Sequence, residues 1–187
     1  MSENLEKYEL DASESTFTVQ AFASGLLKGL GHDPTVGIRD FKGEAKFSPE
    51  TFDNAELRIE VDARSLAVID NVKEKDVKEV ERTMHEDVLE TSSFPEIVFQ
   101  STSITTTRII PGRYKAKIIG DLTLHGQTQN GIWIMAQLTL DGDSLRAKGD
   151  FSIKQTNYGI KLVSVAAGAL KLKDELKFNF DLVGRKQ

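Results

Sequence analysis

The chain has 187 residues, of which 39% are hydrophobic and 28% are charged, so we expect one packed domain rather than a disordered chain. The 24 Lys and Arg residues against 29 Asp and Glu residues give a net charge of -5. This charge argues against nucleic-acid binding, which needs a basic face for the phosphates. Cysteine is absent, which excludes disulfides, cysteine-ligated metals and thiol catalysis.

The N-terminal residues carry two acids and no apolar stretch, which is not the pattern of a secretory signal peptide. Nowhere does the chain contain the run of about 18 apolar residues that a membrane-spanning helix needs. We therefore expect a cytoplasmic protein without stable membrane insertion, or a periplasmic one if a leader has been removed.

Alternation of apolar and polar residues predicts eight antiparallel strands, each with one apolar and one solvated face. The alternating runs cover residues 16–21, 40–47, 56–62, 97–104, 114–124, 132–140, 145–153 and 176–182. Turn residues at Ser48-Pro49-Glu50, Pro111-Gly112 and Asp141-Gly142-Asp143 separate consecutive runs. The chain is thus expected to be all-β, and eight half-buried strands are enough to close a single barrel over residues 1–187.

One segment, at about 73–90, has helical rather than strand periodicity. Its apolar residues recur at spacings of three and four, at Val77, Val80, Met84 and Val88. We expect this inserted helix to lie over the barrel or its mouth. A weaker segment, Gly25 to Pro34, is rich in Gly and Leu and is interpreted as a short helix or an apolar loop.

The sequence contains no pattern for metal or nucleophilic chemistry. Its histidines are His32, His85 and His125, which are dispersed and form no metal-binding motif. They are better interpreted as turn or strand-end residues that bond locally to the backbone. The strand positions expected to face inward carry no cluster of lysines or carboxylates. An apolar interior of this kind favours binding of a long hydrophobic molecule.

Several segments, in order along the chain, resemble the YceI-like family of lipocalin-like isoprenoid-binding proteins. The resemblance extends from about Tyr8 to Val183. Its motifs are Tyr8-Glu9-Leu10-Asp11 with Ser15-Thr16-Phe17-Thr18-Val19, Phe41-Lys42-Gly43-Glu44, Thr83 to Thr91 with Phe94-Pro95-Glu96-Ile97-Val98-Phe99, Gly120 to Gly126, and Phe151 to Ile160.

The resemblance implies an eight-stranded antiparallel lipocalin-like barrel around a long apolar pocket for an isoprenoid lipid, a quinone or an isoprenyl phosphate. It implies transport or storage, frequently as a homodimer, with no catalytic residues and no cofactor beyond the bound lipid. By strand parity, the residues expected to touch the lipid are Phe17, Val19, Phe41, Leu57, Ile59, Phe99, Leu122, Ile134, Leu138, Phe151 and Ile153.

Two alternatives remain open at this point. The protein could be an enzyme acting on an isoprenoid or acyl lipid, with His125, His32 and Tyr158 as its candidate polar groups. It could also be a filled barrel that serves as a stress or interaction protein. The segment Ala23 to Pro34 departs from the usual family pattern, so the resemblance does not define the pocket mouth.

Overall fold

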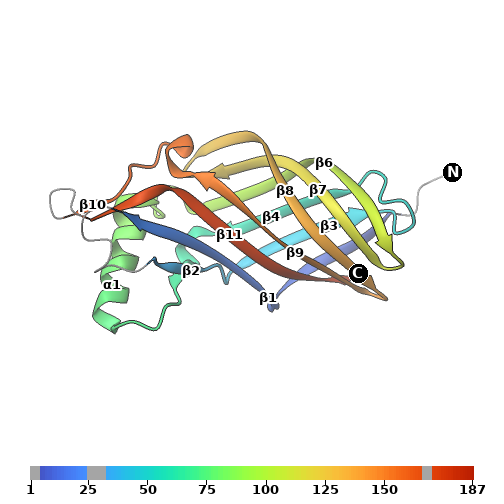
Figure 1. Ribbon diagram of the computed structural model, residues 1–187, viewed down its shortest axis with the longest axis horizontal. Coiled ribbons are helices and arrows are strands. Elements are labelled where there is room, and N and C mark those ends of the chain that lie inside the picture. The colour runs from blue at the N-terminus through green and yellow to red at the C-terminus, as the bar shows by residue number, and fades with distance from the viewer. Residues whose placement is uncertain (1–4, 25–32, 166–169) are drawn as a thin grey trace.

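The computed structural model describes residues 5–24, 33–165 and 170–187. Within them, eight long strands form an antiparallel sheet that closes on itself (Figure 1). This confirms the predicted barrel. The eight strands are β1 (Glu6–Ser24), β3 (Phe41–Phe47), β4 (Glu56–Asp62), β6 (Glu96–Ile110), β7 (Arg113–Leu124), β8 (Gln127–Asp141), β9 (Ser144–Lys154) and β11 (Leu170–Lys186).

Each long strand pairs with the next long strand along the chain, and β11 returns to pair with β1. The closing register places Phe17 opposite Phe180 and Tyr8 opposite Lys186. Three short strands extend the sheet at one end: β2 (Thr35–Gly37) pairs with β1, β5 (Ala67–Val68) with β2, and β10 (Ser164–Val165) with β11.

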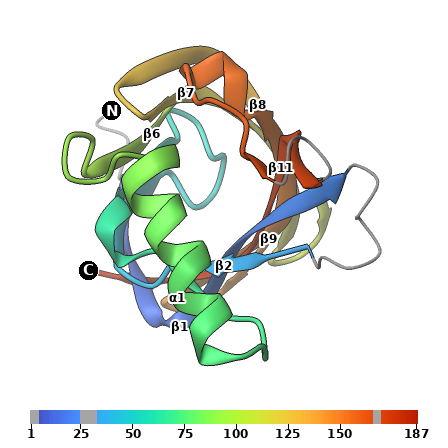
Figure 2. The same ribbon diagram turned by 90° about the vertical axis from the view of Figure 1, so that its left-hand side faces the viewer.

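The predicted helix is confirmed as α1 (Glu74–Thr83), which continues into a π-helical segment, Met84–Val88. Figure 2 shows α1 lying across one end of the ring of strands. Met84 and Val88 pack against the core, so the apolar face of the helix covers that end of the barrel. None of the described helices is long and apolar enough to cross a membrane.

Short turns join the strands where the sequence provides residues for left-handed backbone conformations. Pro111 and Gly112 join β6 to β7, and Gly112 has a φ of +74°. His125 and Gly126 join β7 to β8, and both have positive φ, as a two-residue hairpin turn of the primed type requires. These tight connections keep neighbouring strands adjacent around the barrel.

Glycines inside two strands make room for aromatic rings of the neighbouring strands. A Cβ atom added at Gly120 would come within 2.5 Å of the Phe99 ring, and one added at Gly149 would come within 2.6 Å of the Phe180 ring. The rings therefore lie over the glycines on the inner wall. The segment Gly25–Pro34 lies outside the described residues except for Asp33 and Pro34.

Candidate functional site

An apolar cavity of about 130 Å³ lies inside the barrel. Among the described residues that line it, all but Glu56 are apolar. One water needs about 10–15 Å³ on the same scale, so the cavity is large enough for several waters but offers them almost no hydrogen-bond partners. Such a site is suited to an apolar molecule.

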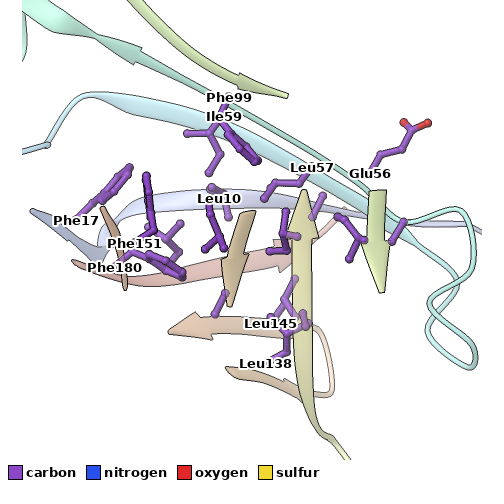
Figure 3. Close-up of a pocket in the computed structure, with 18 of the residues that line it drawn as sticks. Leu10, Phe17, Glu56, Leu57, Ile59, Phe99, Leu138, Leu145, Phe151 and Phe180 are labelled. Carbon is purple, nitrogen blue, oxygen red and sulfur yellow. The ribbon is translucent and has the colours of Figure 1, made fainter. Parts of the chain in front are cut away.

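All eight long strands supply side chains to the cavity wall, and Figure 3 shows several of these side chains converging on one space. Eight of the eleven residues predicted to touch a ligand are among them, which agrees with the predicted inward parity at those positions. They are Phe17, Leu57, Ile59, Phe99, Leu122, Ile134, Leu138 and Phe151. Whether they touch a lipid stays a prediction.

The other three predicted residues, Val19, Phe41 and Ile153, do not line the cavity. Phe41 and Ile153 are buried, and Val19 is half-buried against the core. Each lies nearer to the end covered by α1 than a lining residue of its own strand does. In β9, for example, Phe151 lines the cavity, whereas Ile153 does not and lies two residues further along the strand toward that end. The cavity thus stops short of these three side chains, although on the β4–β6 side it extends to Val61, which pairs with Phe41.

The structure adds wall residues that the alternating runs did not single out. Leu10 lines the cavity although Phe17, of opposite parity, does so as well. An irregularity in the β1 pairing between Asp11 and Thr16 explains both, because a bulge changes which residues face inward. Phe52 lies in the loop between β3 and β4, outside any periodic run.

Aromatic rings close the end of the cavity opposite α1. Phe47 and Phe52 line the cavity there, and the Phe47 ring stacks on Tyr8 with centroids 5.0 Å apart. Phe52 stacks on Phe47 and also contacts the ring of Tyr114, with 4.6 Å between the centroids of Phe52 and Tyr114. Tyr8, Phe47 and Phe52 are all buried. This group, Tyr8, Phe47, Phe52 and Tyr114, is called the aromatic plug below.

Beside the aromatic plug, the wall between β4 and β6 loses its regular backbone ladder. The two strands pair from Arg58 with Gln100 onward, but the preceding residue, Leu57, donates its N–H to the Ser101 hydroxyl oxygen at 2.8 Å. Leu57 and Ile104, on either side of this break, both line the cavity.

Glu56 is the charged residue at this place on the wall. It is exposed, and in Figure 3 its carboxylate points away from the apolar side chains. Glu56 is therefore the lining residue that reaches from the cavity wall to the protein surface, at the break between β4 and β6. We call this place the side opening.

The two histidines among the described residues, His85 and His125, hold the segment around α1 in place. His125 Nδ1 lies 3.1 Å from the main-chain oxygen of Tyr158, and Nε2 lies 2.8 Å from the Glu90 carboxylate. His85 Nε2 lies 2.9 Å from the main-chain oxygen of Leu66. His125 lies in a turn and both histidines contact backbone oxygens, as expected, but these bonds are not local, because the partners are 19 to 35 residues away in sequence.

The candidate groups for catalysis do not meet at the cavity. His125 and Tyr158 are absent from its described wall, and His32 lies outside the described residues. The Tyr158 side chain is fully buried, burial raises its pKa to about 12, and its hydroxyl has no hydrogen-bond partner among the described residues. The described chain also contains no group of three or more His, Asp or Glu side chains arranged for a metal ion.

Comparisons with known proteins agree with this geometry. A curated relative from Pseudomonas fluorescens strain Pf-5, named UPF0312 protein, is 32% identical over 111 residues, 58% of this chain. The match spans about half, 53%, of that relative's length. Two solved structures share the fold over nearly their whole length, 98% of each chain.

The first of these structures is BcnA of Burkholderia cenocepacia, with a TM-score of 0.71, 16% identity and 93% of this chain covered. The second is described as a polyisoprenoid binding domain from Saccharophagus degradans implicated in plant cell wall breakdown, with a TM-score of 0.66, 14% identity and 96% covered. A family profile for the YceI-like domain matches residues 8–184. The chain therefore belongs to the YceI-like family.

Proposed function

We propose that this protein binds and carries an isoprenoid lipid inside its barrel without converting it chemically. The observation that carries the proposal is the apolar cavity, whose described wall contains Glu56 as its single charged residue. Burial of about 500 Å² of an isoprenoid tail contributes roughly 12 kcal/mol before the loss of chain freedom is subtracted. The structural similarity to a polyisoprenoid binding domain supports the same ligand class.

We further propose that the head group of the lipid is uncharged, as in a quinone. The tail would occupy the cavity and the head would lie at the side opening, beside the Glu56 carboxylate. A phosphate head would be repelled there, although solvent screening limits the repulsion to a few-fold in affinity at about 0.15 M salt. The Glu56→Gln variant should therefore take up isoprenyl phosphate better than the wild type does, with quinone uptake unchanged.

The test is native mass spectrometry of protein purified without added lipid, followed by organic extraction and identification of the released molecule. A co-purifying isoprenoid, or stoichiometric uptake of a long-chain isoprenoid quinone by the empty protein, is the expected result. The bound lipid should be recovered unchanged after hours of incubation. An empty protein that takes up neither isoprenoid quinones nor isoprenyl phosphates would overturn the proposal.

A further inference from the structure

The wall formed by β6, β7 and β8 differs in charge from the rest of the protein. Residues 101–140 contain four Lys and Arg residues but one carboxylate, Asp121, in a chain whose net charge is -5. Within this wall, residues 126–140 carry no charged side chain at all. The stretch 101–140, which leaves out only the terminal carboxylates Glu96 of β6 and Asp141 of β8, is therefore positive on an otherwise acidic molecule.

The four cations of this wall are exposed. They are Arg108, Arg113, Lys115 and Lys117, and none of them has an ion-pair partner among the described residues. On the neighbouring strand β9, by contrast, Arg146 and Lys148 share the Asp181 carboxylate, at 2.6 and 3.0 Å. The positive charge of the β6–β8 wall is therefore free to act on an external partner.

Large apolar side chains are exposed among these cations. Trp133 is 62% exposed and lies opposite Ile119, next to the Met135–Lys117 pair. Together with Gly131, these four residues bound a shallow hollow on the outer surface.

The tip of the β6–β7 hairpin adds two further apolar side chains. Ile109 is 54% exposed and Ile110 is 50% exposed, and Arg108 and Arg113 flank them in sequence. Apolar and aromatic side chains interleaved with cations are typical of surfaces that lie at a membrane interface.

We propose that the β6–β8 wall docks on the surface of an anionic phospholipid bilayer. Arg113, Lys115 and Lys117 of the outer face are directed at the lipid phosphates, whereas Arg108, which pairs with Tyr114, lies at the rim of the hairpin tip. Trp133, Ile109 and Ile110 enter the headgroup region. A second copy of the chain fits this wall poorly, because a two-fold dimer through it would place the row of cations against itself.

The position of the wall suits the exchange of a lipid between the barrel and a bilayer. This role depends on the proposed function. The β6–β7 hairpin lies at the end of the barrel opposite α1, and Tyr114 of β7 belongs to the aromatic plug (Figure 1). The side opening is bounded on one side by β6 itself. Docking through β6–β8 would bring this opening close to the bilayer in which an isoprenoid resides.

Trp133 is the single tryptophan of the chain, so its fluorescence reports directly on this wall. Vesicles of equal parts phosphatidylglycerol and phosphatidylcholine should shift its emission to shorter wavelength, and about 0.5 M salt should reverse the shift because it screens surface charges. Vesicles of phosphatidylcholine alone should leave the emission unchanged. An emission indifferent to phosphatidylglycerol, or shifted equally by both vesicles, would overturn the proposal.

The double variant Lys115→Gln and Lys117→Gln should lower partitioning onto the anionic vesicles roughly tenfold or more, since each lysine near such a surface contributes about fivefold. The matched control, Lys75→Gln with Lys78→Gln, removes the same charge from exposed positions of α1 and should bind as the wild type does. Equal loss in both variants would show that overall charge, rather than the wall, governs binding and would contradict the proposal.

A blue shift that grows with protein concentration without vesicles, together with dimers in sedimentation, would show that a second copy covers the wall and would also overturn docking. The vesicles contain no isoprenoid, so the result does not depend on whether the cavity binds one. A failure of docking and a failure of isoprenoid binding are therefore separate results.

Discussion

The ring of Phe52 lies parallel to the ring of Phe47, with centroids 4.7 Å apart and planes within 4°, although the Phe52 backbone is left-handed at a φ of +57°. For a bulky residue this conformation costs about 1–2 kcal/mol. Burial of the ring in the aromatic plug offsets that cost. Packing at the closed end of the cavity thus holds a turn that its local sequence disfavours.

Two substitutions of Phe52 should separate the ring from the backbone. Both Phe52→Ala and Phe52→Gly lose the stacked ring, and the alanine variant should lose about 3–5 kcal/mol of unfolding free energy. The glycine variant should be more stable than the alanine variant by about 1 kcal/mol, because glycine adopts positive φ without strain. Urea denaturation measures the difference. An alanine variant at least as stable as the glycine variant would contradict the strained turn.

A tryptophan at Leu122 should fill the cavity and leave the fold intact. Leu122 lines the cavity, whereas Leu124, on the same face of the same strand, does not, and each is 5% exposed. Leu122→Trp should lose less than about 1 kcal/mol of stability but take up far less isoprenoid quinone, while Leu124→Trp overpacks solid core and should lose about 1–3 kcal/mol. Thermal unfolding with quinone uptake by native mass spectrometry would check both. Equal destabilisation would mean that Leu122 is also solid core.

A methyl group at Gly149 should disturb the inner wall. The added Cβ would collide with the main-chain oxygen of Met135 and approach the Phe180 ring to 2.6 Å, so Gly149→Ala should lose about 1–3 kcal/mol. Gly184→Ala is the matched control, since its nearest neighbour, Tyr8 Cβ, would lie at an ordinary 3.5 Å. Chemical denaturation of the two variants should rank them in this order, and the reverse order would contradict the packing of Phe180 over Gly149.

The buried Tyr158 hydroxyl, which has no hydrogen-bond partner in the described part of the chain, should make the protein sensitive to alkali. Burial raises its pKa from 10.0 to about 12, so between these values the unfolded chain ionises first and stability falls as pH rises. Tyr158→Phe should gain up to about 1 kcal/mol at pH 7 and should lose less stability than the wild type between pH 10 and 12.

Tyr8→Phe provides the comparison for this prediction. The Tyr8 hydroxyl donates a hydrogen bond to Glu6 at 3.1 Å, so its removal should cost about 1 kcal/mol at pH 7 instead of stabilising. Burial also raises the pKa of Tyr8 to about 12, so both variants should lose less stability than the wild type in alkali. Unfolding followed by circular dichroism at pH 7 distinguishes the two tyrosines. A Tyr158→Phe variant less stable than the wild type at pH 7 would show that the hydroxyl has a partner.

The sequence alone predicts the eight long strands well because each has one buried and one solvated face, which leaves a period of two. The same alternation places Ile59, Leu122 and Ile134 on the cavity wall. Parity fails where the backbone departs from regular pairing, as at the β1 irregularity that turns Leu10 inward. Parity also does not indicate how far a cavity extends along a strand. It places Phe151 and Ile153 on the same inner face, but only Phe151 lines the cavity.

Residues outside periodic runs are the hardest to predict. Phe52 lies in a loop, and its burial depends on rings of Tyr8, Phe47 and Tyr114 that come from three different strands. The helix was predictable because its apolar spacing is local. Its attachment through His85 and His125 was not, because their partners are distant in sequence.

The pairing of β1 with β11 also constrains when the barrel can fold during synthesis. The barrel closes only when the segment Leu170–Lys186 reaches the segment Glu6–Ser24, so the cavity cannot exist until β11 has left the ribosome. Until then β1 and β9 present unpaired edges, and such long-range closure is intrinsically slow. A nascent chain that lacks β11 therefore has no enclosed cavity, and the proposed ligand could enter only after that strand has been synthesised.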